Sequence, residues 1–399
     1  MKKITTLLTA IIGMAFMNQV SATHVTVEVP TAGQLSSLVQ NANCDSITIS
    51  GNLDGNDFWY IREQMPNLIY LNIGKVTVPD NKLPESGLYS KKALQKIILP
   101  DNLEIIGNHA FAYCSNLKDI TFPKSLVTIE YNVFYQSGLS EAILPENLKE
   151  IGDGVFYECY NLEKVTFPKT LVTIGNNAFR QCNLSEITLP DSLKTIGNNA
   201  FRYCQQLQKV TFPEKLETIG TYAFSDCFRL HTTTLKGKTA PAISDNTFNY
   251  TKVFYVPEGA AQTYKDASNW SNLIIIDGNT PKKITVTLTT AGTLGEEILK
   301  QVDYVKQVNE LVINGPLNSD DFYQIQQQTT NLIAIDLTEA TIESLPENFF
   351  YERTALLDIK LPATLKSIGR YAFFRCYGLT QITIPEGVTS IKNLSLIHI

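Results

Sequence analysis

The sequence predicts an elongated solenoid of stacked short repeats rather than a globular domain. The first observation is a leucine that recurs at spacings of 22 or 23 residues from Leu94 to Leu230. The second is a proline that keeps the same spacing from Pro100 to Pro213. A unit of this length cannot enclose a core alone, so neighbouring units must stack to bury their apolar side chains. We therefore expect short parallel strands on one side and an irregular or short-helical convex side.

Residues 1–22 have the features of a secretory signal peptide. Lys2 and Lys3 precede an uncharged run from Ile4 to Met17, and the small residues of Val20–Ala22 follow. The run is too short to cross a bilayer, which takes about 20 apolar residues. We expect an exported protein, secreted or at the cell surface, with the periplasm as an alternative compartment. No later stretch predicts a transmembrane segment in the mature chain.

Each regular repeat contains two apolar segments joined by turns. The first reads L-x-x-[IV]-x-[LF]-P, and its alternation predicts a short strand that the proline ends. The second reads L-x-x-I-G-x-x-A-F-x-x-C and returns to the same interior. The one-residue variation in length falls in an outer loop, where length is tolerated. We expect one continuous interior column made of Phe111, Val133 with Phe134, Phe156, Phe179, Phe201 and Phe224.

This unit resembles the leucine-rich repeat of BspA-type bacterial surface proteins. Residues 46–235 carry the resemblance, irregularly at first and then closely, although Ser137 replaces the cysteine expected in the second regular repeat. Val253–Pro257, with Tyr264 and Trp270, is similar to the closing cap of such arrays. The resemblance implies a leucine-rich-repeat solenoid outside the cell, with adhesion or partner binding as its role. Such motifs specify a fold better than a function.

A larger duplication indicates two copies of a cap-plus-repeats module. Thr31-Ala32-Gly33 recurs as Thr290-Ala291-Gly292, and residues 49–68 match residues 313–332 at a constant offset of 264. The second copy stops early, so we expect a truncated C-terminus; the alternative is a natural end in which Ser395 and Leu396 fill the Ala and Phe positions. The predicted boundaries are a signal peptide at 1–22, an N-terminal cap with irregular repeats at 23–93, the regular array at 94–235, a closing cap at 236–277, a linker at 278–282 and the second module at 283–399.

Composition argues against several classes of function. The net charge of -6 is not that of a nucleic-acid-binding protein, which needs clustered basic residues. The four histidines are not at metal-ligand spacing and no catalytic set repeats, so we expect no metal, no cofactor and no enzyme activity. Six of the seven cysteines share one repeat position, which favours buried reduced thiols over disulfides.

Two polar motifs are interpreted as structural. Asp57 and Asp321 lie in acidic turns before helical segments, so we expect helix caps there rather than calcium ligands. Gly175-Asn176-Asn177 and Gly197-Asn198-Asn199 are expected to form turns, because Asn and Gly tolerate left-handed backbone.

The outward-facing strand residues are the candidate binding site. They flank the central apolar residue of each strand and form one charged row and one threonine row. Two interpretations stay open, because opposite charges on neighbouring strands can pair with each other, whereas an open solenoid face can also bind a partner. The candidate residues are Lys96, Asp119, Thr121, Glu141, Lys164, Thr166, Glu186, Thr188, Lys209 and Thr211.

The predicted function is a secreted or cell-surface interaction and adhesion scaffold. Its partner would be an extracellular protein or glycan, from a host or a microbe, bound through the repeat faces. A repetitive strip suits an elongated partner contacted at many weak points better than a small molecule in a closed pocket. The alternative is an enzyme or inhibitor with its activity in an irregular end module, and the absence of a clustered catalytic set in the sequence disfavours it.

Overall fold

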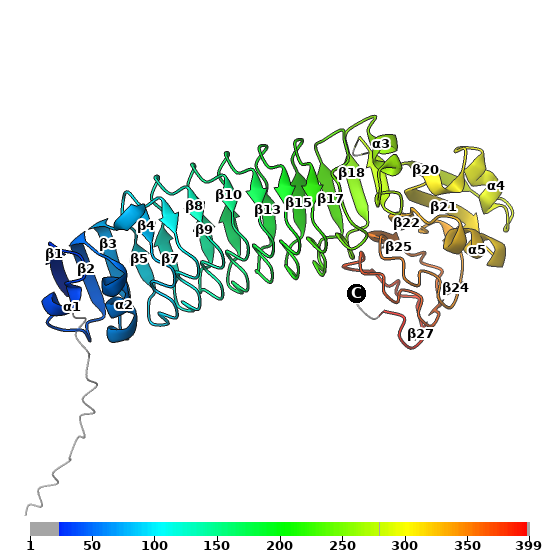
Figure 1. Cartoon of the computed structure of the whole chain (residues 1–399). Coiled ribbons are helices and arrows are strands. Elements are labelled where there is room, and N and C mark those ends of the chain that lie inside the picture. The colour runs from blue at the N-terminus through cyan, green and yellow to red at the C-terminus, as the bar shows by residue number, and fades with distance from the viewer. Residues whose placement is uncertain (1–23, 279, 397–399) are drawn as a thin grey trace, which may run out of the picture.

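The computed structural model describes residues 24–278 and 280–396, and the predicted signal peptide lies outside them. Successive turns of the chain stack along one axis into an elongated solenoid (Figure 1). Neighbouring strands pair in parallel, both in the N-terminal part and in the later repeats. The predicted leucine-rich-repeat solenoid is confirmed.

The described part of the chain begins with a cap in which two helices cover a parallel sheet (Figure 1). Its elements are β1 (His24–Val29), α1 (Leu35–Leu38), β2 (Ser46–Asn52), α2 (Gly55–Gln64), β3 (Tyr70–Thr77) and η1 (Pro79–Asn81).

The N-terminus of α2 differs from the prediction in one respect. The N-cap is Asp54, whose carboxylate accepts from the backbone N–H groups of Asn56 and Asp57. Asp57 is instead the third helical residue, and its carboxylate accepts the N–H of Asp54 at 3.0 Å, which completes a capping box. The same carboxylate accepts from Gly33 at 2.6 Å and Leu35 at 2.9 Å, so it ties the preceding loop to the helix.

The second module repeats this arrangement. Asn318 is the N-cap of α5 (Ser319–Gln327), and Asp321 is the third helical residue. The Asp321 carboxylate accepts from Gly292 at 2.6 Å, Leu294 at 2.9 Å and Asn318 at 3.0 Å. The recurrence of the Thr-Ala-Gly motif therefore reflects a loop that each buried aspartate holds in place.

The regular array has two rows of strands. The first row forms what we call the strand face, and it consists of β5 (Lys96–Ile98), β7 (Asp119–Thr121), β9 (Glu141–Ile143), β11 (Lys164–Thr166), β13 (Glu186–Thr188), β15 (Lys209–Phe212) and β17 (Thr232–Leu235). The second row forms one continuous seven-stranded sheet of β4 (Lys82–Leu83), β6 (Ile105–Ile106), β8 (Thr128–Ile129), β10 (Glu150–Ile151), β12 (Thr173–Ile174), β14 (Thr195–Ile196) and β16 (Thr218–Ile219).

The sequence predicted an irregular or short-helical convex side. In the structure, the second row of short strands lies where short helices were one of the two expectations. The described α-helices lie in the cap segments and outside the array. Glycine lets successive turns of this row approach closely, since a Cβ at Gly197 would lie 2.6 Å from the carbonyl carbon of Gly175. The following Asn177 and Asn199 have φ values of 53° and 56°, as predicted for left-handed turn residues.

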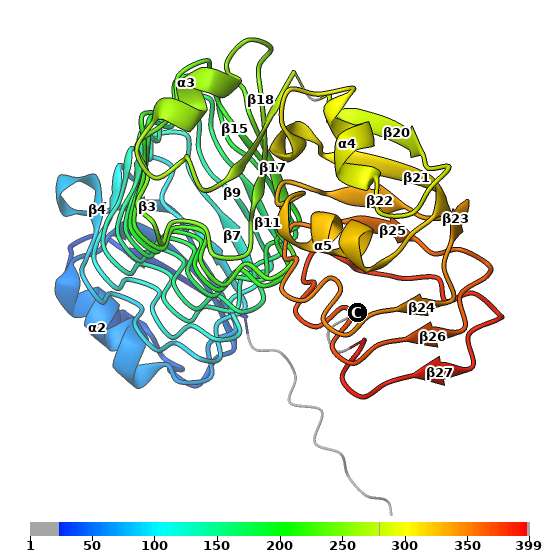
Figure 2. The same ribbon diagram turned by 90° about the vertical axis from the view of Figure 1, so that its right-hand side faces the viewer.

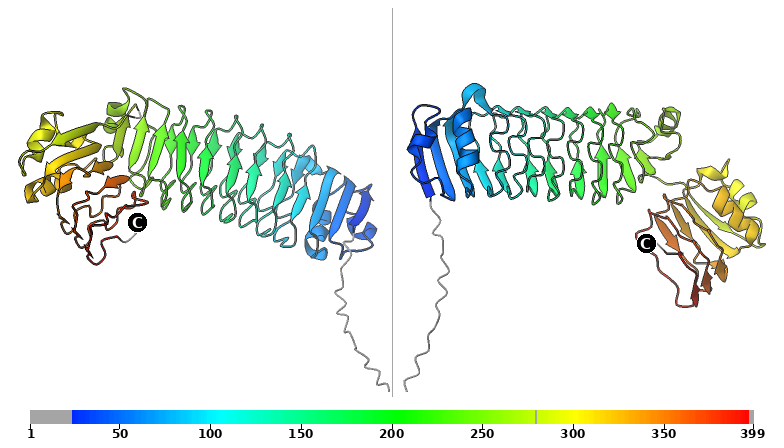
Figure 3. Two further views of the ribbon diagram at one scale, coloured as in Figure 1. Left: turned by 180° about the vertical axis from the view of Figure 1, so that it is seen from behind. Right: turned by 60° about the horizontal axis from the view of Figure 1, so that its bottom comes forward.

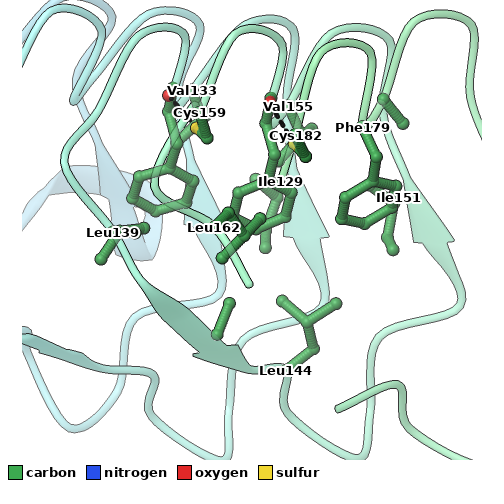
Figure 4. Close-up of a cluster of buried hydrophobic side chains, with 14 of the residues drawn as sticks. Ile129, Val133, Leu139, Leu144, Ile151, Val155, Cys159, Leu162, Phe179 and Cys182 are labelled. Carbon is green, nitrogen blue, oxygen red and sulfur yellow. Dashed lines mark hydrogen bonds between the residues drawn. The ribbon is translucent and has the colours of Figure 1, made fainter. Parts of the chain in front are cut away.

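The core of the array is the predicted phenylalanine column. Phe156, Phe179 and Phe201 are fully buried, and their neighbouring ring centroids are 5.2 Å apart in stacked geometry. The stack extends to Phe111 on one side and Phe224 on the other. Figure 4 shows Phe179 directed into this interior with the leucine and isoleucine side chains of neighbouring strands.

The cysteines are buried, as the sequence predicted, five of them beside this column, Cys44 in the N-terminal cap and Cys376 in the core of the later repeats. All seven are free thiols. Six of them donate from Sγ to a backbone carbonyl of the preceding repeat, as Cys182 does to Phe156 at 3.1 Å and Cys204 to Phe179 at 3.1 Å. Ser137, which replaces a cysteine, is also buried and contacts Cys159 Sγ at 3.4 Å.

Repeat length determines whether neighbouring strands of the strand face pair. Units of 23 residues give paired strands, as in β5 with β7, β9 with β11 and β13 with β15. Units of 22 residues lead from β7 to β9 and from β11 to β13, and there the sheet is interrupted. The variation in length was expected to be tolerated in this outer loop, and the structure adds that the shorter units lack the hydrogen bonds between two strands.

The array ends in a cap built around two aromatic residues. This cap contains β18 (Val253–Val256), α3 (Ala261–Asp266) and β19 (Ile274–Asp277). Trp270 is fully buried and donates from Nε1 to Pro241 O at 2.9 Å, while the Tyr264 hydroxyl donates to Gly237 O at 2.9 Å. Both bonds reach back to the preceding loop, so they close the open end of the stack.

Residues 283–396, which we call the second module, have their own hydrophobic core. Ile333 of this module packs against Val253, Ile274 and Ile276 on the outer face of the closing cap. Figure 2 and Figure 3 show the second module beside the C-terminal end of the first array. Its remaining elements are β20 (Lys283–Thr287), α4 (Leu294–Leu299), η2 (Val305–Gln307), β21 (Glu310–Pro316), β22 (Ala334–Asp336), β23 (Ala340–Thr341), β24 (Ser344–Leu345), β25 (Asp358–Lys360), β26 (Ser367–Ile368) and β27 (Ser390–Ile391).

Candidate binding surface

The structure places all ten candidate residues on the strand face. Nine of them are exposed and Thr211 is half-buried. They lie there because the central residue of each strand points inward, as Ile187 and Val210 do, so that its two neighbours point outward. The side chains offer hydroxyl groups in one row and charges of both signs in the other.

The charged row pairs internally at one end only. Lys96 Nζ lies 2.6 Å from Asp119 Oδ2, and the hydrogen bond to this carboxylate, together with its charge, raises the pKa of Lys96. Glu141 stands opposite Lys164, and Glu186 stands opposite Lys209, in the register of their strands. Among the described residues, these four side chains make no ion pair within 4.0 Å.

A groove opens where β11 and β13 fail to pair. Its volume is about 500 Å³, and its walls include four candidate residues, Lys164, Thr166, Glu186 and Thr188. The half-buried ring of Phe167 and the half-buried Val165 provide an apolar floor. Val165 is half-buried, whereas Ile187, the inward residue of the strand across the groove, is buried.

The strand face thus presents hydroxyl groups, charges of both signs and an apolar groove floor. Within residues 24–278 and 280–396, no group of three or more His, Cys, Asp and Glu side chains could hold a metal ion. In the same part of the chain, no helix has the length and apolar character to cross a bilayer.

Both the repeat unit and its arrangement match a known family. The family profile described as BspA type leucine-rich repeat region matches six copies over residues 81–204, 172–285 and 306–397. These ranges cover more than half of the chain. The chain belongs to the BspA-type leucine-rich repeat family.

Solved structures of bacterial leucine-rich-repeat proteins are similar to this chain. A leucine-rich repeat protein from Bacteroides ovatus is 22% identical over 81% of this chain and 80% of its own, with a TM-score of 0.37. A leucine-rich cell surface protein from Faecalibacterium prausnitzii is 20% identical over 93% of this chain and 78% of its own, with a TM-score of 0.38. No curated protein sequence matches the chain.

The outer loops of the BspA-type array carry an aromatic row that sequence analysis missed. Tyr89, Tyr113, Tyr135 and Tyr157 follow one another with ring centroids 5.0–5.3 Å apart. The row continues with the Arg180 guanidinium, which lies 5.2 Å from the Tyr157 ring centroid. The signal in the sequence is a Tyr or Arg between the column phenylalanine and the cysteine position of successive repeats.

Proposed function

We propose that this protein is an exported adhesion scaffold, secreted or held at the cell surface, that binds a host or microbial protein through the strand face. The observation that supports this most directly is the row of unpaired charges at Glu141, Lys164, Glu186 and Lys209. If the row served only to join neighbouring strands, each register-matched pair would form an ion pair as Lys96 and Asp119 do. These charges are therefore available to a partner.

The size and chemistry of the face favour a protein over a small ligand. At a strand spacing of about 4.8 Å, the face extends about 25 Å from β5 to β15, which is comparable with the width of an ordinary protein interface of about 800 Å² per partner. Because both signs of charge alternate, we expect modest weakening by salt rather than the steep dependence of nucleic-acid binding. The membership of the BspA-type family supports an interaction role for the array.

Replacement of Thr166, Thr188 and Thr211 together by Lys tests the proposed surface. Each substitution places a long cation on the strand face without touching the core, so the fold should persist while partner binding weakens by about tenfold or more. Partners would be captured from host-matrix and microbial surface extracts, identified by mass spectrometry, and then titrated as purified proteins by surface plasmon resonance.

The matched control is the triple replacement of Thr173, Thr195 and Thr218 by Lys, which adds the same charge to the second row of strands. This control should bind with the affinity of the unmodified protein. If the strand-face variant folds and binds an identified partner unchanged, the strand face is not the site.

A further inference from the structure

The second short repeat creates a notch in the outer loops. Its loop, Gln181 to Asn183, lies between the Tyr160 loop and the loop of Gln205 and Gln206 in the neighbouring repeats. Because this unit has 22 residues, its loop is one residue shorter than its two neighbours and lies recessed between them. The resulting pocket has a volume of about 400 Å³ and is lined by Tyr160, Gln181, Cys182, Asn183, Tyr203, Gln205 and Gln206.

The lining combines aromatic rings with amide side chains and contains no charged residue. Tyr160 is 55% exposed, and among the described residues its ring makes no aromatic or cation contact, so one ring face is open. Its hydroxyl is hydrogen-bonded to Glu158, and burial of the hydroxyl together with this bond raises the pKa of Tyr160 to about 12. The ring is therefore neutral at physiological pH.

The amide groups around the notch lack protein partners. In the described part of the chain, the side chains of Gln181, Asn183, Gln205 and Gln206 make no hydrogen bond to the protein. Asn116, which holds the position of Asn183 three repeats earlier, does donate to Lys92 O at 2.8 Å. Each amide offers two N–H donors and one carbonyl acceptor. Four solvent-accessible amides without protein partners, beside one open aromatic face, form a concentrated set of neutral hydrogen-bonding groups.

We propose that this notch binds a neutral sugar residue of a glycan. A pyranose ring has an apolar face of C–H groups and a rim of hydroxyl groups that both donate and accept hydrogen bonds. The Tyr160 ring matches the apolar face, and the four amides match the rim. The pocket volume suits one or two sugar residues and is at the lower end of small-ligand sites.

Other ligand classes fit the notch less well. An anionic ligand would need a cation, and no lysine or arginine lines the pocket. An apolar peptide side chain would need an aliphatic wall, whereas no Ala, Val, Leu, Ile or Met side chain lines the pocket. The site is on the outer loops rather than on the strand face, so it can fail without affecting the proposed protein-binding function.

Titration with neutral disaccharides tests this site. Maltose, cellobiose, lactose and diacetylchitobiose would be added to the full chain and followed by isothermal calorimetry and saturation-transfer NMR. At least one should bind saturably, with transfer to its ring C–H protons. Tyr160→Ala should weaken that binding by about tenfold or more, and Gln205→Ala, at an exposed amide, should weaken it as well. Tyr131→Ala removes a tyrosine of similar exposure, 51%, outside the pocket and should leave binding unchanged.

A matched pair of insertions tests the origin of the notch. One serine inserted after Asn183 lengthens the recessed loop to that of its neighbours and should abolish sugar binding by filling the pocket. One serine inserted after Gly138, in the other short loop, should leave sugar binding unchanged. The proposal is overturned if none of the four disaccharides binds at millimolar concentration, if a sulfated disaccharide binds in their place, or if folded Tyr160→Ala and Gln205→Ala variants bind as tightly as the unmodified chain.

Discussion

Phe179 occupies the middle of the phenylalanine column and has no exposed surface. We expect Phe179→Ala to lower the free energy of unfolding by about 3–5 kcal/mol, because apolar burial is lost and the flanking rings cannot close the cavity. Urea denaturation followed by circular dichroism measures this change. The control is Ile143→Ala, at a strand-face position that is 68% exposed, where we expect a change within about 0.5 kcal/mol. A loss below about 1 kcal/mol for Phe179→Ala would contradict the column.

Lys91 is a buried cation at the end of the N-terminal cap. Its ammonium donates to Met65 O at the C-terminus of α2. Arg353 has the equivalent position in the second module, where it donates to Ile325 O and Thr329 O at the end of α5. A cation is favourable at this end of a helix. Burial nevertheless lowers the pKa of Lys91 from 10.5 to about 8, because desolvation outweighs the nearby charges.

The contribution of Lys91 to stability should depend on pH. Between pH 8 and pH 10.5 the unfolded chain retains the Lys91 proton while the folded chain loses it. The unfolded state then binds more protons, so the stability that Lys91 contributes rises with pH across this range. The free energy of unfolding of the unmodified chain minus that of Lys91→Met should therefore increase by about 3 kcal/mol. Lys91→Arg is the control, because an arginine stays protonated, and like Lys91→Met it should lack this rise. Equal slopes of the free energy of unfolding against pH for all three proteins would contradict this prediction.

Periodicity was sufficient to predict which residues form the core, and insufficient to predict which polar residues hold the caps. A column phenylalanine such as Phe179 is recognised from spacing alone, since its role recurs in every repeat. Lys91 acts on a helix 26 residues earlier in the chain, and only the folded structure brings the two together. Asp57 was placed correctly near the start of α2, but its bonds to Gly33 and Leu35 depend on the path of the preceding loop.

At the level of elements, the strand face was predictable because an alternating pattern with a terminal proline has few other interpretations. The second row of two-residue strands was not, because such a short segment shows no periodicity. The sequence shows which repeats have 22 residues, but only the structure shows that strand pairing is interrupted at those repeats. The notch in the outer loops also results from a 22-residue repeat.

Amide hydrogen exchange should detect the interruption between β11 and β13. The backbone N–H groups of Glu163 and Gln208, each just before a strand, donate to a carbonyl of the preceding repeat at 2.9 and 2.8 Å. The N–H of Ser185, just before β13 and after a 22-residue unit, has no such bond among the described residues. We expect Ser185 to exchange about tenfold faster or more. Insertion of one serine after Asn183 should slow it by restoring a 23-residue unit. Equal protection of all three amides would show that the sheet is continuous.

At the scale of the whole molecule, the contact between the two modules could not be predicted. Val253 and Ile276 have the pattern of ordinary cap strands, and nothing in the sequence distinguishes their outer faces from solvent-facing ones. In the structure these faces pack on Ile333, and the Tyr250 and Tyr377 rings meet at a centroid distance of 5.3 Å. We therefore propose residues 278–282 as a connection between two packed modules.

The buried cysteines should make the whole molecule sensitive to alkali. Desolvation raises the pKa of all seven thiols from 9.0, to about 12 for Cys114, Cys159, Cys204 and Cys376. Above pH 9 the unfolded chain therefore loses thiol protons that the folded chain keeps. The folded state then binds more protons, so this contribution to stability is present below pH 9 and is lost as pH rises toward 12.

We expect the free energy of unfolding of the unmodified chain, measured by urea titration in the presence of a reductant, to fall steadily from pH 9 to pH 11. This trend opposes that of Lys91, and seven thiols outweigh one amine. Cys204→Ala should make the fall shallower by removing one ionising group. Thiol counting provides the control, because native protein should react slowly with a thiol reagent, whereas denatured protein without reductant should show seven thiols. A count of one would mean three disulfides, and it would overturn both the reduced state and the alkaline trend derived from it.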